Sequence, residues 1–500
     1  MNGDLPVTVP PHRDLVAGTW QPCADDLGSV LLEDPSTGEV LGPARATGPD
    51  RVEHALVAAA DLAGAGAWAD PDTRADVLDA VADAVDKRVP DIVALEAFAT
   101  GVPLAQTRIL GVIIAGAFRL AADRIRAGVL YEEHRRHDGR TVHVHRRPLG
   151  AGVGRVPGSP PAPRPAHKAA SALAAGCPVI LKPSELAPYG TQLLAESIAD
   201  VLAEHGQPSA AFQFLHGDAR TGAALVADHR VRAVSFTGGT QGGIAVGRAC
   251  AERMVPAQLE LGGCNPLVVM PDADPAAAAA MAVDLLTTLN GQWCRALGRL
   301  IVPAALRDPV LEAVAEELGT LRTGPATEAS TEYGPLVHST HRRRIRDAVT
   351  RFTRHGAARE HAWTDVPEHG NYLAPTLVTG VPLEAALDEV FGPVATVHTY
   401  TDLDQAVAIA NAGVLGLEGY VAGTDEEAAL AVAERVGAGE VKVNGSSIMS
   451  LHMDTPRPAW GMSGLGDEGT VETLRLFTGA RVVGVENARA LHRPQRGGAT

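Results

Sequence analysis

Cys294 and Glu260 are two side chains whose types suit covalent catalysis. Cys294 follows an Ala-rich segment, 274–290, whose apolar residues have helical spacing, and a Gly–Gln turn separates the segment from the thiol. This arrangement predicts a cysteine at the end of a rigid element rather than inside one. A thiolate is a strong nucleophile, and a carboxylate can serve as a general base. A free cysteine is also commonly a small buried hydrophobe, so both interpretations stay open from these residues alone.

A predicted strand–helix unit lies upstream of this pair. A buried strand within 177–185 ends in a turn that carries Lys182 and Glu185, and a helix is expected over 189–204. Ligands of open α/β sheets bind at such strand ends. Lys182 can donate to ribose or phosphate oxygens there, and Glu185 can accept a hydrogen bond from a ribose hydroxyl.

A second unit has a predicted strand at 231–236 and a glycine-rich turn at 237–243 that opens a helix. Glycines let the backbone approach a pyrophosphate, and a helix N-terminus attracts negative charge. A tight turn with helix-capping glycines is an equal alternative. The Gly-x-Gly-x-x-Gly pattern at 464–469 has no strand before it, so we interpret it as a chance match.

The composition indicates a large chain with a substantial core. Its 500 residues, 46% of them hydrophobic, predict two or three domains. The net charge of −16 disfavours nucleic acid or an anionic membrane as partner. No secretory leader is recognisable and no run approaches about 18 apolar residues, so a cytoplasmic location is expected. The scattered cysteines argue against a disulfide framework or a zinc site, and no metal is expected.

Other segments follow simple periodicities. Thr141–His145 alternates as a strand, and Ala480–Val485 is expected to pair with it. Lys168 and Lys182 lie close together in a chain with four lysines, which indicates positions that require a compact ammonium, although chance is the alternative. Helical spacing predicts helices at 50–63, 72–98, 105–127, 306–319, 339–355, 403–412 and 425–437.

The segments around Glu260 and Cys294 also carry a resemblance. Leu-Glu-Leu-Gly-Gly at 259–263 and Gly-Gln-Trp-Cys at 291–294 resemble the two active-site motifs of the NAD(P)-dependent aldehyde dehydrogenase superfamily, in order and in spacing. Three further segments resemble family landmarks, and the resemblance extends over about residues 14–485. These segments are Thr-Gly-Gly-Thr-Gln-Gly-Gly at 237–243, Gly-Asn-Tyr-Leu-Ala-Pro-Thr at 370–376 and Glu-Val-Phe-Gly-Pro-Val at 389–394.

The resemblance implies an α/β fold of the aldehyde dehydrogenase type. It has a Rossmann-like NAD domain, an α/β catalytic domain and a small β arm that joins subunits, so a homodimer or homotetramer is expected. The implied limits are 1–125 and 146–258 for the NAD-binding domain, 259–455 for the catalytic domain, 126–145 and 470–490 for the arm, and 491–500 for a flexible tail.

The resemblance also implies a reaction. Cys294 would attack an aldehyde to form a thiohemiacetal, which passes hydride to NAD and becomes a thioester, and Glu260 would activate the water that releases the acid. Lys168 is expected to position groups or move protons. NAD is favoured over NADP because the carboxylate of Glu185 repels a 2′-phosphate. The expected cofactor-binding residues are Lys182, Ser184, Glu185, Gly238, Gly239, Thr240, Gly262, Glu389 and Phe391.

Ser159 departs from the family pattern. Counting back from Lys182 and Lys168 places it where relatives have the asparagine that holds the oxyanion. A serine hydroxyl is shorter than an amide, and loss of an oxyanion donor costs roughly 2.7–4 kcal/mol in comparable sites. Our hypothesis is that Ser159 is the surviving donor and therefore a catalytic residue.

The expected substrate site is polar. Arg164 and His167 would lie about one helical turn apart, close enough to share a carboxylate or phosphate, although solvated helix residues are an equal alternative. With Trp293 and Arg295 beside the nucleophile, we predict an aldehyde with a polar or anionic group. One alternative is a CoA-acylating relative, which the retained general base argues against. Another is a protein of this fold that lost activity and serves in binding.

Overall fold

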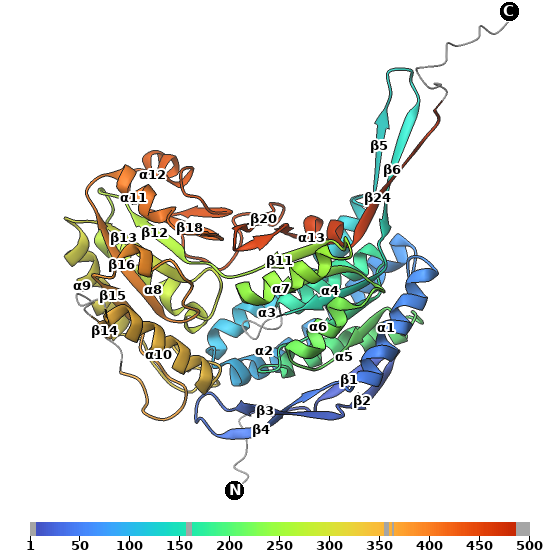
Figure 1. The fold of residues 1–500 in the computed structure, drawn as a ribbon, viewed down its shortest axis with the longest axis horizontal. Coiled ribbons are helices and arrows are strands. Elements are labelled where there is room, and N and C mark those ends of the chain that lie inside the picture. Colours follow the sequence, from blue (N-terminus) through green and yellow to red (C-terminus); the bar gives the residue numbers. More distant parts are fainter. Residues whose placement is uncertain (1–6, 157–162, 355–359, 363–364, 487–500) are drawn as a thin grey trace, which may run out of the picture.

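Two mostly parallel sheets, each flanked by helices, organise the chain (Figure 1). The structure is a computed structural model that describes residues 7–156, 163–354, 360–362 and 365–486. Within that part of the chain the first sheet has eight strands. In spatial order they are β2 (Thr19–Pro22), β1 (Arg13–Val16), β9 (Phe212–Phe214), β8 (Val179–Lys182), β7 (Ala151–Arg155), β10 (Val231–Thr237), β11 (Ala257–Glu260) and β22 (Gly464–Leu465).

The central strands of this sheet are buried on both faces. The strands from β9 to β11 run parallel, and Val179, Ile180 and Leu181 of β8 are fully buried, as expected where helices cover both faces. Apolar side chains from both layers of helices meet those of the strands. One face is covered by α4 (Pro163–Ala175) and α5 (Tyr189–Glu204), backed by α2 (Pro71–Thr100) and α3 (Leu104–Arg126), and the other by α1 (Pro49–Gly64), α6 (Ala219–Ala227) and α7 (Thr240–Ala251).

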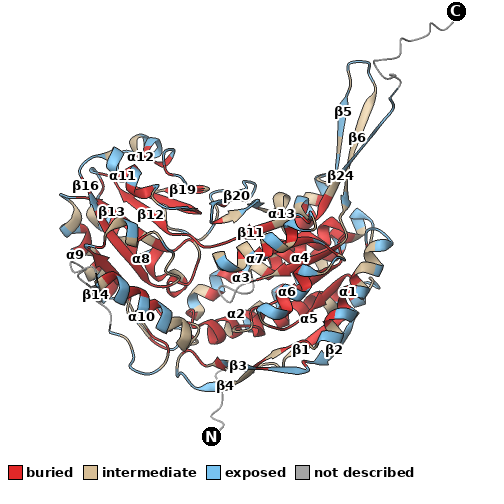
Figure 2. Cartoon of the chain, in the orientation of Figure 1, coloured by how far each residue is buried: buried red, intermediate tan, exposed pale blue. Residues whose placement is uncertain are grey.

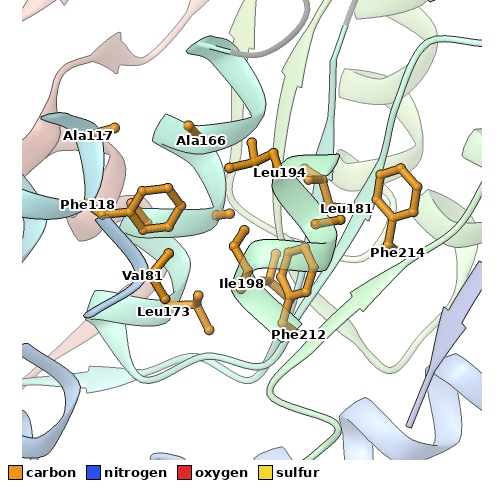
Figure 3. Packing of buried hydrophobic residues seen from close by; sticks show 14 of the residues in the cluster. Val81, Ala117, Phe118, Ala166, Leu173, Leu181, Leu194, Ile198, Phe212 and Phe214 are labelled. Atoms are coloured by element: carbon orange, nitrogen blue, oxygen red, sulfur yellow. The ribbon is translucent and has the colours of Figure 1, made fainter. Parts of the chain in front are cut away.

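Figure 3 shows the apolar core on the first of these faces. Phe118 of α3 and Val81 of α2 lie near Leu173 of α4, while Leu181 of β8 lies near Leu194 of α5. Figure 2 shows that burial is concentrated in the two sheets and the helices against them. The large core follows from this layered packing of small and branched apolar side chains.

Helix α3 qualifies the expectation that no apolar run reaches the length of a membrane span. It has 23 residues and is apolar enough to cross a membrane by length and composition. In the structure it packs against α2 and α4, and Ile114, Phe118 and Ile125 are buried in the core. The place of α3 between other helices therefore accounts for the apolar residues on its buried face, whereas Ile109 and Val112 are exposed.

The second sheet carries the segment after Cys294. Its strands are parallel except for β14, which pairs antiparallel with β15. In the described residues the order is β14 (Glu360–Ala362), β15 (Thr376–Thr379), β16 (Val394–Tyr400), β13 (Leu297–Pro303), β12 (Asn265–Val269), β18 (Glu418–Ala422) and β19 (Glu440–Val443). Its helices are α8 (Pro275–Thr287), α9 (Arg307–Gly319), α10 (Ser339–Thr353), α11 (Leu403–Ala410) and α12 (Glu426–Ala433), with the short helices η1 (Thr288–Gly291) and η2 (Leu383–Ala385).

A three-stranded sheet projects from the first sheet (Figure 1). It consists of β5 (Tyr131–Arg135), β6 (Thr141–Pro148) and β24 (Thr478–Gly484), and α13 (Thr470–Leu476) leads into β24. Val482 pairs with Val144 and Arg481 with His145, so the predicted pairing of the two segments is confirmed.

The N-terminal strands were not predicted from the sequence. Besides β1 and β2, the segments β3 (Asp25–Glu33) and β4 (Val40–Ala46) form an antiparallel ribbon before α1. The ribbon contacts the second half of the chain: Glu33 accepts hydrogen bonds from the amide of Ser339 at 2.8 Å and from Nδ2 of Asn371 at 2.9 Å. These partners are more than 300 residues away in sequence, so no local sequence pattern predicts the contacts.

The predicted helices agree closely with α1, α2, α3, α5 and α9. The limits of the predicted domains stay a prediction. The structure adds that β11 and β22 belong to the first sheet, although β22 follows the whole second sheet in sequence. Two small strand pairs complete the described residues: β17 (Leu415–Gly416) with β21 (Trp460–Gly461), and β20 (Arg457–Pro458) with β23 (Asp467–Glu468).

Candidate active site

The turn that presents Cys294 is left-handed over three consecutive residues. Helix α8 ends at Thr287, earlier than predicted, and Leu289, Asn290 and Gly291 then have φ of 52°, 57° and 71°. Such a conformation costs free energy for a non-glycine residue and persists where the surroundings hold it. At Gly291 a Cβ would lie 2.4 Å from the backbone of Gly392, so a glycine is required there.

Asn290 supplies the bonds that hold this turn. Its Nδ2 donates to the carbonyl oxygens of Gly101 at 2.7 Å and Pro335 at 2.9 Å, and its Oδ1 accepts from the amide of Gly334 at 3.0 Å. The side chain is fully buried. The thiol is thus presented by a turn whose geometry depends on contacts with distant loops.

Asn265, which the sequence did not indicate, fixes the backbone of the nucleophile. Its Nδ2 donates to the carbonyl oxygens of Cys294 at 2.9 Å and Ala296 at 2.7 Å, while its Oδ1 accepts from the amide of Glu418 at 3.1 Å. Asn265 begins β12, two residues after the Glu-Leu-Gly-Gly segment ends. It therefore ties the loop of the nucleophile to the second sheet.

Glu260 is a buried carboxylate at the end of β11. Both carboxylate oxygens lack a hydrogen-bond partner among the described residues, and the residue is 1% exposed. Burial, and after it the charge of Glu468, raise the pKa of Glu260 to about 7 against the opposing charge of Arg164. A buried carboxylate with a pKa near neutrality and no fixed partner is suited to accept a proton from water.

Arg164, near the start of α4, contacts both Glu468 and the nucleophile. Its Nη1 forms an ion pair with Oε2 of Glu468, and its Nη2 lies 3.7 Å from Sγ of Cys294. Burial raises the pKa of the Cys294 thiol, and the charges of Arg164 and Arg295 partly offset this effect. The structure thus brings Arg164, predicted to contact substrate, directly to the sulfur.

Lys168 and His167 belong to a buried hydrogen-bond network behind α4. Lys168 donates to Oγ of Ser235 at 2.6 Å, and Ser235 donates to Oε1 of Gln258 at 2.8 Å. Nε2 of Gln258 donates to Oγ1 of Thr473 at 2.9 Å, and Thr473 also hydrogen-bonds His167 at 2.9 Å. Burial lowers the pKa of Lys168 to about 8 and that of His167 to about 4.

Lys182 and Glu185 lie where the sequence predicted them, at the end of β8. Nζ of the buried Lys182 donates to the carbonyl oxygen of Pro183 at 2.7 Å and lies 3.7 Å from Oε2 of Glu185. Burial lowers the pKa of Lys182 to about 8, although Glu185 acts in the opposite direction. Oγ of Ser184 accepts from the amide of Leu186 at 3.2 Å and so shapes the turn.

The glycine-rich turn after β10 opens α7 as predicted. Gly239 is the N-cap of α7 and Thr240 its first residue, and a Cβ on Gly239 would meet no atom within 4 Å. A Cβ on Gly238 would lie 2.6 Å from the Phe236 ring. Arg155, at the adjacent end of β7 and not noted in the sequence, lies over the same ring at 5.1 Å from its centroid.

Gly262 and Glu389 approach each other across the two halves of the chain. Oε1 of Glu389 accepts from the amide of Gly263 at 3.1 Å, and a Cβ on Gly262 would lie 2.1 Å from Oε2. Burial raises the pKa of Glu389 to about 7. Nearby, the carbonyl oxygen of Phe391 lies 2.7 Å from Nε2 of His341, and their rings meet edge to face.

Trp293 and Arg295 face the protein interior. Trp293 lies in the apolar core of the second sheet and is 4% exposed. Arg295 forms ion pairs with Glu418 and, at 3.1 Å, with Glu440. The guanidinium of Arg295 was predicted to contact substrate. Its charge is instead balanced by two buried carboxylates, one on β18 and one on β19. Ser159 lies outside the described residues.

Arg457 is a cationic neighbour that sequence reasoning missed. Its Nε makes no hydrogen bond to a described residue and lies 3.9 Å from Oε2 of Glu440. Its backbone pairs with that of Glu468 through β20 and β23, and its charge lowers the pKa of Glu260. No local signal identified it, because its neighbourhood arises from two short strands that meet in the fold.

Taken together, the residues define a class of protein. Glu260 ends β11 of the first sheet, Glu468 ends β23, and Cys294 precedes β13 of the second sheet. Within the first sheet, the end of β10 leads into glycines and the end of β8 carries a buried lysine. A cysteine beside a buried carboxylate of near-neutral pKa, in a fold whose parallel strand ends are of the kind that bind dinucleotides, is suited to covalent oxidation of a carbonyl compound.

Comparison with known proteins places the chain within that class. The aldehyde dehydrogenase family matches residues 23–483. Geranial dehydrogenase of Castellaniella defragrans is 30% identical over 481 residues, which are 94% of this chain and 98% of that protein. The chain belongs to the aldehyde dehydrogenase family.

Solved structures agree with this assignment. An aldehyde dehydrogenase structure from Burkholderia cenocepacia has a TM-score of 0.86 at 31% identity and covers 95% of this chain and 100% of that one. A mutant of aldehyde dehydrogenase C from Pseudomonas syringae, solved with NAD+ and octanal, has a TM-score of 0.86 at 27% identity and covers 95% and 98%. The predicted fold class is confirmed.

Proposed function

We propose that the protein oxidises an aldehyde to a carboxylic acid with NAD through a covalent intermediate on Cys294. The observation that carries this proposal is the placement of Glu260. It is a buried carboxylate without hydrogen-bond partners among the described residues, and it lies close enough to Cys294 for their charges to interact. Burial holds the pKa of Glu260 at about 7, so both protonation states are populated near neutral pH.

The chemistry of the chain's own residues follows in order. The Cys294 thiolate forms a bond to the aldehyde carbon, and the carbonyl electron pair moves to oxygen to give a thiohemiacetal. When bound, the nicotinamide supplies the acceptor for the hydrogen and electron pair that leave this carbon. Glu260 then takes a proton from water, which attacks the resulting thioester and frees the acid and the thiol. Lys168, with a pKa near 8, is proposed to assist proton movement behind Glu260.

The proposed cofactor residues fit a dinucleotide. Gly239 offers open space at the N-terminus of α7, and the buried ammonium of Lys182 lies at the neighbouring strand end. Glu389, against Gly262, would bind the nicotinamide ribose, and Phe391 would pack near the nicotinamide. We propose NAD over NADP because Glu185 faces Lys182 at the ribose position. The NAD+ complex of the Pseudomonas syringae relative supports this choice.

We propose a polar or anionic aldehyde as substrate, but the residues that we propose to contact it differ from those predicted from the sequence. Arg164 pairs with Glu468, His167 with Thr473 and Arg295 with Glu418, so these side chains already have protein partners. Nε of Arg457 has no hydrogen-bond partner among the described residues and only a long ion pair, 3.9 Å, with Glu440, so Arg457 is the better candidate for an anionic group. We propose that Trp293 lines the substrate site as an apolar side chain and makes no polar contact with the substrate. Ser159 is kept as a proposed donor.

We further propose that the protein works as a homodimer or homotetramer, in the cytoplasm and without nucleic acid or membrane partners. The arm supports self-association because its edge strand β24 exposes Val482 and Val483. The net charge of −16 disfavours anionic partners.

The proposal is tested by NADH formation at 340 nm with a panel of short semialdehydes and long alkyl aldehydes. NAD and NADP are compared in parallel, and Cys294→Ala is the blank. Turnover with NAD on the semialdehydes, absent from Cys294→Ala, is expected. Turnover that survives in Cys294→Ala would overturn the covalent mechanism, and a preference for long alkyl aldehydes would overturn the polar substrate.

A further inference from the structure

Arg164 is oriented toward Cys294 by a buried partner. Its Nη1 forms an ion pair with Glu468, whose side chain is 5% exposed, and its Nη2 lies 3.7 Å from Sγ. A guanidinium is planar, so fixing one nitrogen fixes the direction of the other. The pairing with Glu468 therefore aims a hydrogen-bond donor at the nucleophile.

The charge of this donor is present at every working pH. Burial would raise the pKa of Glu468, but Arg164, His167, Lys168 and Arg457 outweigh it and hold the pKa below its usual range. Arginine stays protonated in proteins, and its carboxylate partner raises the pKa of Arg164 further. A fixed cation at hydrogen-bond distance from a sulfur favours the thiolate over the thiol.

The same donor can reach the oxygen that becomes charged after attack. When the thiolate bonds to an aldehyde carbon, the carbonyl oxygen gains the electron pair and lies one bond from the carbon attached to Sγ. A donor already in contact with the sulfur is within reach of that oxygen.

We propose that Arg164 is a catalytic residue whose guanidinium, anchored by Glu468, stabilises first the Cys294 thiolate and then the alkoxide of the thiohemiacetal. The second part rests on the proposed aldehyde oxidation, whereas the first part concerns the free enzyme alone. In the attack step the S–C bond forms, the carbonyl π bond breaks toward oxygen, and no proton is transferred, because the guanidinium supplies the countercharge.

The thiolate part is tested by the pH dependence of alkylation with iodoacetamide, without aldehyde or cofactor. Cys294 is the partly exposed thiol, whereas Cys23, Cys177, Cys250 and Cys264 are buried, so labelling reports mainly on the nucleophile. Cys294→Ala gives the background. In Arg164→Met the midpoint of alkylation is expected to move up by about one pH unit, the size of effect that one nearby opposite charge produces.

The alkoxide part is tested by steady-state turnover of the best aldehyde from the panel. Arg164→Met is expected to lower kcat by about a hundredfold, comparable to loss of one oxyanion donor, with a smaller change in KM. Arg164→Lys keeps the charge and is expected to restore part of both effects. Arg435→Met, which loses an exposed ion pair with Asp404 on the protein surface, is the matched control and should behave as wild type.

Each outcome decides the proposal. A wild-type alkylation profile and wild-type kcat in Arg164→Met would overturn it. A shifted profile in an enzyme that oxidises no aldehyde would support the thiolate part and reject the proposed function instead. If Arg164→Met does not fold, as judged by circular dichroism, Arg164→Lys and Arg164→Gln are compared. Equal alkylation midpoints in these two variants would overturn the role of the charge.

Discussion

At the scale of single residues, the site contains one buried carboxylate, Glu260, whose burial no hydrogen bond from a described residue compensates. Burying a carboxylate without partners costs free energy, and Glu260 shows this cost as a pKa raised to about 7. Glu389 has a pKa raised to about 7 by burial as well, but it accepts a bond from Gly263. The two carboxylates thus have similar affinities for protons but different surroundings.

Glu260 is expected to set the lower pH limit of activity. Its carboxylate form is the base, so kcat should rise as pH increases through about 7 and then level off. Glu260→Gln should remove this rise and slow acid release by about a hundredfold, leaving a burst of NADH in stopped-flow absorbance. Glu389→Gln is the matched control and should retain the rise. If kcat of Glu260→Gln still increased with pH through about 7, the increase would belong to another titrating group.

At the scale of elements, the site is built from strand ends and the turns after them. The turn after β11 carries Gly262 and Gly263, and the turn after η1 carries Cys294. These turns approach other backbones or carboxylates too closely for a side chain, as the contact of Gly262 with Glu389 shows. The elements therefore determine where chemistry occurs, and the glycines determine how closely the two halves approach.

Gly262→Ala should weaken cofactor binding. The added Cβ would lie 2.1 Å from Oε2 of Glu389, so the carboxylate must shift from the position proposed for the nicotinamide ribose. A loss of about 1.4 kcal/mol would raise the Kd for NAD roughly tenfold, measured by fluorescence titration without aldehyde. Gly116→Ala, in α3, meets nothing within 4 Å and should bind NAD as wild type. An unchanged Kd in Gly262→Ala would contradict the role of Glu389.

At the scale of the whole molecule, the site lies between two sheets and a third sheet projects away from both. The arm is mostly exposed or half-buried (Figure 2). Its edge strand β24 exposes Val482 at 66% and Val483 at 46%, which is unusual for an edge strand that remains in water. We propose that a second copy of the chain buries this edge.

Val483→Lys is expected to reduce the assembled mass of the protein in solution. An ammonium at the centre of an apolar contact would be desolvated without a partner, whereas in the isolated subunit the side chain is solvated. Light scattering coupled to size exclusion measures the mass, and Val57→Lys, on the exposed face of α1, is the matched control. An unchanged mass in Val483→Lys would exclude β24 as the subunit contact.

Much of the fold follows from local patterns. Helical periodicity located α1, α2 and α3, and strand alternation located the pair β6 and β24. The Glu260 and Cys294 motifs could be recognised because they are contiguous segments in a fixed order. The strands β3 and β4 could not, because their partners in the second half of the chain have no local signal.

By itself, the sequence determined the layered α/β architecture, the candidate nucleophile and the candidate base. Only the tertiary structure decided which charges meet: Arg164 with Glu468 across 304 positions, and Arg295 with Glu418 across 123. Local sequence governs backbone periodicity, whereas the surroundings of a buried charge depend on residues brought together by packing. For that reason the chemistry of Cys294 could be anticipated from its motif, but the cation beside its sulfur could not.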